Sequence, residues 1–515
     1  MISLRLSCSV VGAALLLATG NAPAGQAAIE QLSMVRELLE ASSDYVDLSG
    51  DFAVSASDED AANRARIIAR TYRQRLGLNQ HSDFAVTRTV VDPAGRRHIR
   101  LAQTFDGVPV FGGAIVVHFA PDGRGESITG NPLRLQQPFR NALRIGKAQA
   151  ARTAVASLSA ERASAKSVEL VVLDSKTVFR KDGEPRRAYK VTVTGPGRRD
   201  FVFIDASTGA TLGTLSGIHS ARDRYTYDMH NSTFYATASL ERAEGDIPTG
   251  DTDIDQAHDF AGDTYDFFFN AYGRDGINGA GLPIRSYTHY GINYLNAFWD
   301  GTRLTYGDGF PIDDIVGHEI THGVTEYSAN LIYLFEPGAL SESFSDIFGE
   351  IIDQINGVGS DGIADRWLVG EDLPGFGAIR NMKNPPAFGD PDRIGSPNYY
   401  CGLQDNGGVH INSGVPNKNF TLLVDGGTFN GIDVQPIGLT KASAIHYHSL
   451  TNYLTPLSNM RAHFLGLWRS CWDLRGVALN DPATGAPSGD AISWIDCQQV
   501  LRAGAATQLW TPPCR

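Results

Sequence analysis

The run His318-Glu319-Ile320-Thr321-His322 constrains this chain more than any other stretch. Apolar residues recur around it at the spacing of a helix with one buried face: Ile315, Val316, Ile320 and Val324. Residues four apart share a helix face, so His318 and His322 can bind one metal ion. Glu319 leaves the helix one step round, beside that ion. Two imidazoles and an adjacent carboxylate indicate a zinc site in which the glutamate takes a proton from water.

The pentapeptide alone also fits a surface helix whose histidines face solvent, but the chain downstream favours a metal site. A catalytic zinc uses three protein ligands and keeps one open position. Residues 340–355 have the apolar spacing of a second, largely buried helix. Glu342 and Asp346 lie one turn apart on it, where unpaired carboxylates would be costly. We therefore expect Glu342 to be the third zinc ligand and Asp346 to hold the outer nitrogen of His318.

With these motifs in place, the chain resembles the thermolysin family of secreted zinc endopeptidases over about residues 257–504. Residues 296–299 are similar to the family's edge strand that holds the substrate backbone. Residues 331–333 and 405–414 are similar to the segments that carry its active-site tyrosine and histidine. Residues 379–382 resemble the segment whose arginine binds a substrate carbonyl.

The resemblance implies further roles. His410 and Tyr333 would donate hydrogen bonds to the oxyanion that develops during hydrolysis. Asp405 would orient His410 and favour its charged form. The residues expected to bind substrate are Asn296, Ala297, Trp299 and Arg380, with Ile315, Val369 and Ile379 lining the main specificity pocket. An apolar pocket implies cleavage on the amino side of large apolar residues. Ser341 stands where the family's best-known member has asparagine, which leaves the outer partner of His322 open.

Two alternatives share parts of this pattern. A zinc aminopeptidase has the same pentapeptide and a downstream glutamate, but it also carries an acidic-glycine segment for the free amine, which we do not find. A zinc-stabilised binding protein without catalytic activity needs none of Glu319, Tyr333 and His410. A zinc metalloendopeptidase of 515 residues, acting on proteins and peptides, is therefore the favoured interpretation.

The chain is long enough for several domains, and we expect a secreted precursor. Residues 1–24 have the charged start, short apolar run and small-residue end of a signal peptide. By resemblance, residues 25–135 and 136–217 form an α+β propeptide with a fungalysin/thermolysin-like first part and a PepSY-like second part, which acts as intramolecular chaperone and inhibitor. Residues 218–330 would be a mixed α/β lobe and residues 331–515 a mainly helical lobe, with zinc in the cleft between them.

The net charge limits the partners that the chain can bind, and the spacing of the remaining histidines limits which of them can bind metal. A net charge of −13 argues against nucleic acid or an anionic membrane as a general partner. We also expect the mature protein to be a secreted monomer. His98 and His118 fall in expected strands (98–105 and 108–119) and are interpreted as ordinary sheet residues. His446 and His448 are two apart, on different helix faces, and are interpreted as non-ligands.

Five cysteines occur, and removal of the signal peptide takes Cys8. An even number in a secreted chain suggests two disulfides, for which three pairings are possible. We favour Cys471–Cys497, which lie on neighbouring late helical stretches. Cys401 would then pair with Cys514 and fix the tail.

Acidic residues behind the zinc motif predict at least one structural calcium ion. Asp314 precedes His318 on the first helix, and Glu350 and Asp353 follow Glu342 on the second. Converging carboxylates repel one another unless a hard cation binds between them. Asp365, or less surely Glu371, and the carbonyl of Leu368 could complete the site. The family's two-calcium version needs more acids here, so we expect one ion.

Overall fold

The computed structural model describes residues 45–48, 58–92, 94–135, 142–158, 163–179, 181, 183–195, 198–216, 224–359 and 362–514. The segment assigned to the signal peptide lies outside these residues, as does most of the region between residues 214 and 224 in which maturation is expected. Among the residues described, no helix is both long enough and apolar enough to span a bilayer.

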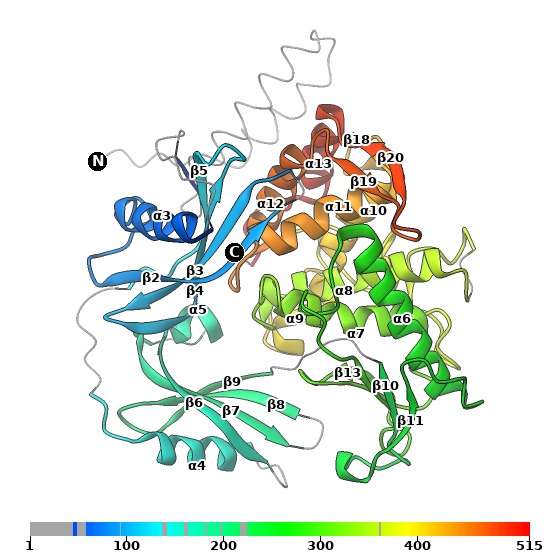
Figure 1. Cartoon of the computed structure of the whole chain (residues 1–515), viewed down its shortest axis with the longest axis horizontal. Coiled ribbons are helices and arrows are strands. Elements are labelled where there is room, and N and C mark those ends of the chain that lie inside the picture. Colours follow the sequence, from blue (N-terminus) through cyan, green and yellow to red (C-terminus); the bar gives the residue numbers. More distant parts are fainter. Residues whose placement is uncertain are drawn as a thin grey trace.

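The first part of the propeptide is an antiparallel sheet covered by one helix (Figure 1). Its elements are β1 (Tyr45–Asp47), α3 (Asp58–Thr71), β2 (Ser82–Val91), β3 (Arg97–Phe105), β4 (Val108–Phe119) and β5 (Gly125–Asn131). The apolar face of α3, including Ala65 and Ile68, is buried against inward-facing sheet residues such as Ile99 and Leu101. The expected strands are present, and the helix expected over residues 60–76 ends at Thr71.

The region expected to form the second part of the propeptide, residues 136–217, repeats this arrangement of sheet and helix. Its elements are α4 (Lys147–Ser157), β6 (Ser164–Leu173), α5 (Ser175–Phe179), β7 (Arg186–Gly195), β8 (Arg198–Asp205) and β9 (Thr211–Ser216). Small residues of α4, Ala150 and Ala154, pack on the sheet at Val191 and Val202. A parallel pair between β4 and β6 joins the two parts into one nine-stranded sheet.

The catalytic unit begins with a five-stranded sheet, in the order β11-β10-β12-β14-β13, followed by two long helices. The elements are β10 (Tyr225–Asp228), β11 (Ser239–Ala243), α6 (Thr252–Tyr272), β12 (Arg285–Thr288), β13 (Ala297–Trp299), β14 (Leu304–Tyr306), α7 (Asp313–Glu326) and α8 (Phe335–Asn356). The sequence predicts a strand over residues 293–299, but β13 covers only Ala297–Trp299, and Asn293 has a φ of 53°, which extended strands do not adopt.

The rest of the chain is mainly helical, as the resemblance implied. The helices are α9 (Asp405–Asn412), α10 (Gly414–Asp425), α11 (Leu439–His448), α12 (Met460–Asp473) and α13 (Trp494–Thr507). Short strand pairs connect them: β15 (Leu368–Val369) with β16 (Arg380–Asn381), β17 (Gly427–Phe429) with β18 (Ile432–Val434), and β19 (Ala478–Asn480) with β20 (Pro487–Ala491). Two disulfides, Cys401–Cys514 and Cys471–Cys497, have the pairing favoured from the sequence.

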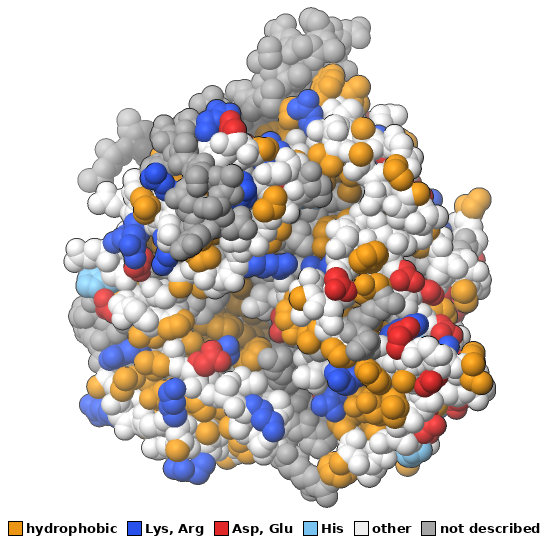
Figure 2. All heavy atoms as spheres, viewed as in Figure 1, with side chains coloured by type: hydrophobic (Ala, Val, Ile, Leu, Met, Phe, Trp, Pro, Cys, Tyr) orange, Lys and Arg blue, Asp and Glu red, His pale blue; other side chains and the backbone are white. Residues whose placement is uncertain are grey.

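The propeptide lies along the side of the catalytic unit from which α9, α11 and α12 face it (Figure 1). Polar propeptide side chains reach catalytic backbone oxygens: Arg88 donates to Tyr327 O, and Arg100 donates to Leu454 O at 2.7 Å. Figure 2 shows Lys and Arg side chains scattered over the propeptide side of this face, while Asp and Glu gather on the catalytic side.

Candidate active site

Two glycines bring the zinc-motif helix α7 close to α8. A Cβ on Gly317 would lie 3.0 Å from the Cα of Gly349, and one on Gly349 would lie 2.5 Å from Asp314 O. Without side chains here, the two backbones approach closely. Both helices are buried in the main core, through Val316, Ile320 and Phe348 among others. The apolar spacing of each helix therefore orients its polar residues toward the other helix.

Three potential ligand atoms converge between these helices. Nε2 of His318 and Nε2 of His322 are 3.2 Å apart. Glu342, which is fully buried, places Oε2 3.4 Å from His318 Nε2 and Oε1 3.3 Å from His322 Nε2. A tetrahedral zinc ion with bonds of ~2.0–2.1 Å separates its ligand atoms by roughly 3.3–3.4 Å. The spacing, the donor set and the buried Glu342 Oε2, which lacks a hydrogen-bond partner, fit zinc.

Each ligand histidine has an outer partner. His318 Nδ1 lies 2.9 Å from Asp346 Oδ1, as expected. Asp346 also accepts hydrogen bonds from Arg380, at 2.6 and 2.9 Å, and from Asn417 at 2.8 Å. The outer nitrogen of His322 faces Ser341 Oγ at 3.2 Å, so a hydroxyl occupies the position that the sequence left open. Asn417 was not identified from the sequence, because no periodic pattern marks it.

Tyr333 and His410 lie beside the three ligands. The Tyr333 hydroxyl donates to Glu342 Oε1 and lies 3.2 Å from His410 Nε2. His410 Nε2 is 3.4 Å from Glu342 Oε2, and its Nδ1 is 2.6 Å from Asp405 Oδ1. The negative charge of Glu342 is the largest effect that raises the pKa of His410, and the hydrogen bond with Asp405 adds to it against the opposing effect of burial. The arrangement favours an imidazolium that can donate a hydrogen bond.

The run Asp405-Asn406-Gly407-Gly408 folds into the turn that makes this arrangement possible. Its four residues have φ values of 52°, 48°, 89° and 79°, in the left-handed region that suits glycine and asparagine. The turn lets Asp405 accept from the backbone N–H of His410 at 2.9 Å as well as contact its ring. One carboxylate thereby fixes both the backbone and the ring of His410.

A cavity of about 1210 Å³ opens in front of these groups, between the propeptide and the catalytic unit. The expected site residues among its lining are His318, Glu319, His322, Glu342, Tyr333, His410, Arg380, Asn296, Ala297, Trp299, Ile315 and Ile379. Strand β13 is the edge strand of its sheet, the position at which an extended peptide can add as a further strand. The propeptide supplies the opposite wall, with Phe111, Gly112 and Gly113 of β4.

Residues expected in the specificity pocket differ in exposure. Ile315 is buried and Ile379 is 41% exposed, and both line the cavity. Val369 is buried behind them and is not among the lining residues, although its carbonyl accepts from the backbone N–H of Ile379 at 2.7 Å. Val369 therefore supports the wall that Ile379 presents.

A second group of carboxylates lies behind the zinc ligands. Asp314, Glu350 and Glu371 each place an oxygen within 4.8 Å of the others. Both oxygens of Glu350 and one of Glu371 are buried without a hydrogen-bond partner. Burial is the largest cause that raises the pKa of Asp314 to about 7 and that of Glu371 to about 8. Asp353 is buried nearby and its charge acts on Glu350. Asp365 is not a member of this group of carboxylates, whereas Glu371, which the sequence placed second, is. The role of the Leu368 carbonyl stays a prediction.

The fold and this site define a class: a zinc metalloendopeptidase with a propeptide. The family descriptions that match the chain agree. "Thermolysin metallopeptidase, catalytic domain" matches residues 200–326, "Thermolysin metallopeptidase, alpha-helical domain" matches residues 329–478, and "Fungalysin/Thermolysin Propeptide Motif" matches residues 82–132.

Full-length relatives extend the likeness. The chain is 34% identical over 429 residues to a bacillolysin of Brevibacillus brevis, covering 74% of this chain and 79% of the relative. It is 34% identical over 457 residues to a thermolysin of Alicyclobacillus acidocaldarius, covering 75% and 81%. Among solved structures, the precursor of protealysin from Serratia proteamaculans matches with 31% identity and a TM-score of 0.43, covering 57% of this chain and 88% of that one. The chain belongs to the thermolysin family of metallopeptidases.

Proposed function

We propose that His318, His322 and Glu342 hold the zinc ion and that Glu319, Tyr333, His410 and Asp405 carry the chemistry. The observation that supports this assignment is the convergence of these side chains. The three potential ligand atoms lie 3.2–3.4 Å apart, Tyr333 and His410 lie beside them, and all line one large cavity. When bound, zinc acts as a Lewis acid that polarises the scissile carbonyl and acidifies water.

The residues of the chain complete the reaction. Glu319 lines the cavity next to the ligand set, so it can accept the proton of the attacking water and pass it to the leaving amine. His410 and Tyr333 donate hydrogen bonds to the oxyanion as it develops, and Asp405 keeps the His410 ring in position. Asp346 and Ser341 hold the outer nitrogens of His318 and His322.

Substrate binding follows from the cavity walls. An extended peptide adds to β13 at Asn296, Ala297 and Trp299. Arg380, held by Asp346, offers guanidinium N–H groups to a substrate carbonyl. The side chain after the cleaved bond enters an apolar pocket formed by Ile315 and Ile379 and supported by Val369, which favours large apolar residues.

The propeptide acts as an inhibitor and is removed by the enzyme itself. It covers the cavity with β4, and Gly112 of that strand approaches Ile332, beside Tyr333, so closely that a Cβ would lie 3.3 Å from the Ile332 side chain. A substrate has to displace this wall. We further propose that the mature enzyme is a secreted monomer.

A calcium ion binds between Asp314, Glu350 and Glu371, with Asp353 nearby. Three acids converge here, and both oxygens of Glu350 and one of Glu371 are buried without a hydrogen-bond partner among the described residues. Carboxylate oxygens are the ligands that this cation prefers. A buried carboxylate without a partner is otherwise costly.

The specificity is tested by digesting a library of peptides with blocked amino and carboxyl termini. Purified mature enzyme is expected to cut inside these peptides, before Leu, Ile, Phe or Val. Ile379→Ala should lower kcat/KM for the largest of these residues more than for the smaller ones. Cleavage that requires a free amine would support an aminopeptidase, and equal cleavage before acidic and apolar residues would overturn the pocket assignment.

A further inference from the structure

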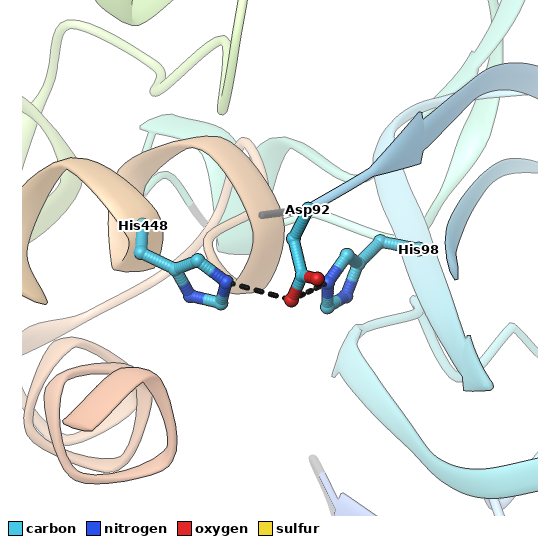
Figure 3. Close-up of side chains that lie close together, drawn as sticks. All are labelled: Asp92, His98 and His448. Atoms are coloured by element: carbon cyan, nitrogen blue, oxygen red, sulfur yellow. Dashed lines mark hydrogen bonds and ion pairs between the residues drawn. The ribbon is translucent and has the colours of Figure 1, made fainter. Parts of the chain in front are cut away.

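A buried carboxylate and two histidines meet where the propeptide touches the catalytic unit (Figure 3). Asp92 follows β2, His98 lies on β3, and His448 ends α11 of the catalytic unit. Nε2 of His98 and Nε2 of His448 are each 3.1 Å from the same oxygen, Asp92 Oδ2. The three side chains point at one another from three elements, two on one side of the interface and one on the other.

The outer nitrogen of each histidine has its own partner. His448 Nδ1 is 3.1 Å from Ser470 Oγ, and His98 Nδ1 is 2.7 Å from His118 Nδ1. His118 Nε2 in turn lies 2.7 Å from Thr129 Oγ1. If the ring protons lie on His98 Nδ1, His118 Nε2 and His448 Nδ1, every one of these contacts is a hydrogen bond and both inner Nε2 atoms keep a free lone pair. This is the tautomer that histidine adopts when it binds a metal through Nε2.

Burial and charge at this place suit a metal ion. Asp92, His98 and His448 are only 6%, 2% and 3% exposed. Both Nε2 atoms converge on Asp92 Oδ2, so the three potential ligand atoms share one buried position. The other oxygen of Asp92 accepts from the backbone N–H of Arg96 at 2.8 Å, which fixes the carboxylate.

We propose that Asp92, His98 and His448 form a second zinc site that bridges the propeptide and the catalytic unit. One carboxylate and two imidazoles are donors that zinc binds in proteins. From the sequence, His98 was interpreted as an ordinary sheet residue, and His448 as a non-ligand because His446 and His448 lie on different helix faces. Since two of the three ligands belong to the propeptide, this site exists only while the propeptide is docked.

Metal content of the uncut precursor tests the proposal. The Glu319→Gln precursor is expected to contain two zinc equivalents per chain, and Asp92→Asn in the same background is expected to contain one. Asp106→Asn is the matched control, because Asp106 also contacts a propeptide histidine, His81 at 2.7 Å, but this pair belongs to no group of three potential metal ligands among the described residues. This control should keep two equivalents. One equivalent in the Glu319→Gln precursor, with no change on Asp92→Asn, would overturn the proposal and leave a hydrogen-bonded cluster without metal.

A second precursor separates this site from the catalytic one. His318→Gln/His322→Gln is expected to retain a single zinc, and X-ray absorption at the zinc edge should show two imidazole nitrogens at that ion. Cobalt substituted into this precursor should give visible d–d absorption that His448→Gln removes. This measurement does not depend on self-processing or on the folding of any propeptide variant. A precursor with no zinc in this background would contradict the bridging site while leaving the proposed protease mechanism intact.

Discussion

Two sets of histidines and a carboxylate in this molecule are assembled in different ways. His318 and His322 lie one turn apart on α7, and Glu342 reaches them from the adjacent α8 within the same core. Asp92 and His98 come from the propeptide, and His448 is 356 residues beyond Asp92 in the catalytic unit. The first set is built into one folded unit and survives maturation. The second depends on docking, so any ion held there reports the docked state.

The two sets also differ in their access to solvent. The catalytic set opens onto a cavity of about 1210 Å³, and His410 beside it has a side chain that is 48% exposed. The set of Asp92, His98 and His448 is buried, and the outer nitrogens of its two histidines contact Ser470 and His118. A metal site with an open position beside a proton acceptor is suited to catalysis, whereas a buried site whose histidines both have outer partners is suited to holding two parts of the chain together.

The largest effect is expected for Glu319→Gln. Loss of the proton acceptor should lower kcat/KM by about 10²–10⁴-fold, the usual contribution of general acid–base catalysis. The precursor should therefore remain uncut, which keeps the two metal sets together in one chain. Electrophoresis of the secreted product and zinc analysis measure this. Normal maturation in a host without other proteases would contradict self-processing.

Calcium removal should have the next largest effect, on stability. A ligand that binds only the folded state at 100–1,000 times its Kd stabilises it by about 2.7–4.1 kcal/mol. A calcium-selective chelator that leaves zinc in place should therefore lower Tm and speed self-digestion of the mature enzyme. The variant Glu350→Gln should have a smaller response to the chelator, because one ligand of the ion is lost. An unchanged Tm, with zinc retained and calcium absent, would show that the ion has no structural role.

Asp346→Asn should weaken the catalytic zinc site without altering its ligands. Outer partners of this kind typically contribute 10–100-fold to metal affinity. Asp346 also pairs with Arg380, so the variant should raise KM for peptides as well. Competition with a zinc chelator measures the affinity. Metal binding by Asp92, His98 and His448 in the precursor should be unaffected. Equal zinc affinity in variant and wild type would remove Asp346 from this role.

The sequence predicted the catalytic set because its spacing is local. The i, i+4 repeat in each of two amphipathic helices defines which side chains share a face, and this holds for His318, His322, Glu342 and Asp346. The propeptide strands expected over residues 98–105 and 108–119 correspond to β3 and β4. Cys471–Cys497 agrees with the pairing argued from neighbouring helical stretches, and Cys401–Cys514 agrees with the pairing that then remained.

Features that depend on packing or on loop conformation were not predictable. The sequence predicts one helix over residues 437–453, but the structure has α11, which ends at His448, and then a wider π-helical turn, Ser449–Tyr453. Apolar spacing does not reveal this division. Glu371, rather than Asp365, joins the acidic group, because a loop without periodicity sets no register. His98 and His448 meet only through docking of two distant segments, and no local pattern encodes that contact.

The smallest expected effect is that of Ser341→Ala, which removes the outer partner of His322, one of the two histidines proposed to bind zinc. Ser341 gives His322 a neutral hydroxyl partner at 3.2 Å, whereas His318 has a carboxylate. A neutral hydrogen bond contributes about 0.5–1.5 kcal/mol, roughly 2- to 12-fold in affinity, so Ser341→Ala should weaken zinc binding less than Asp346→Asn. Ser345→Ala is the matched control on the same helix, because the Ser345 hydroxyl is buried without a hydrogen-bond partner among the described residues. Chelator competition should order the affinities as wild type equal to Ser345→Ala, then Ser341→Ala, then Asp346→Asn. If Ser341→Ala and Ser345→Ala behave alike, the hydroxyl of Ser341 does not hold His322, and packing on α8 alone orients that ring.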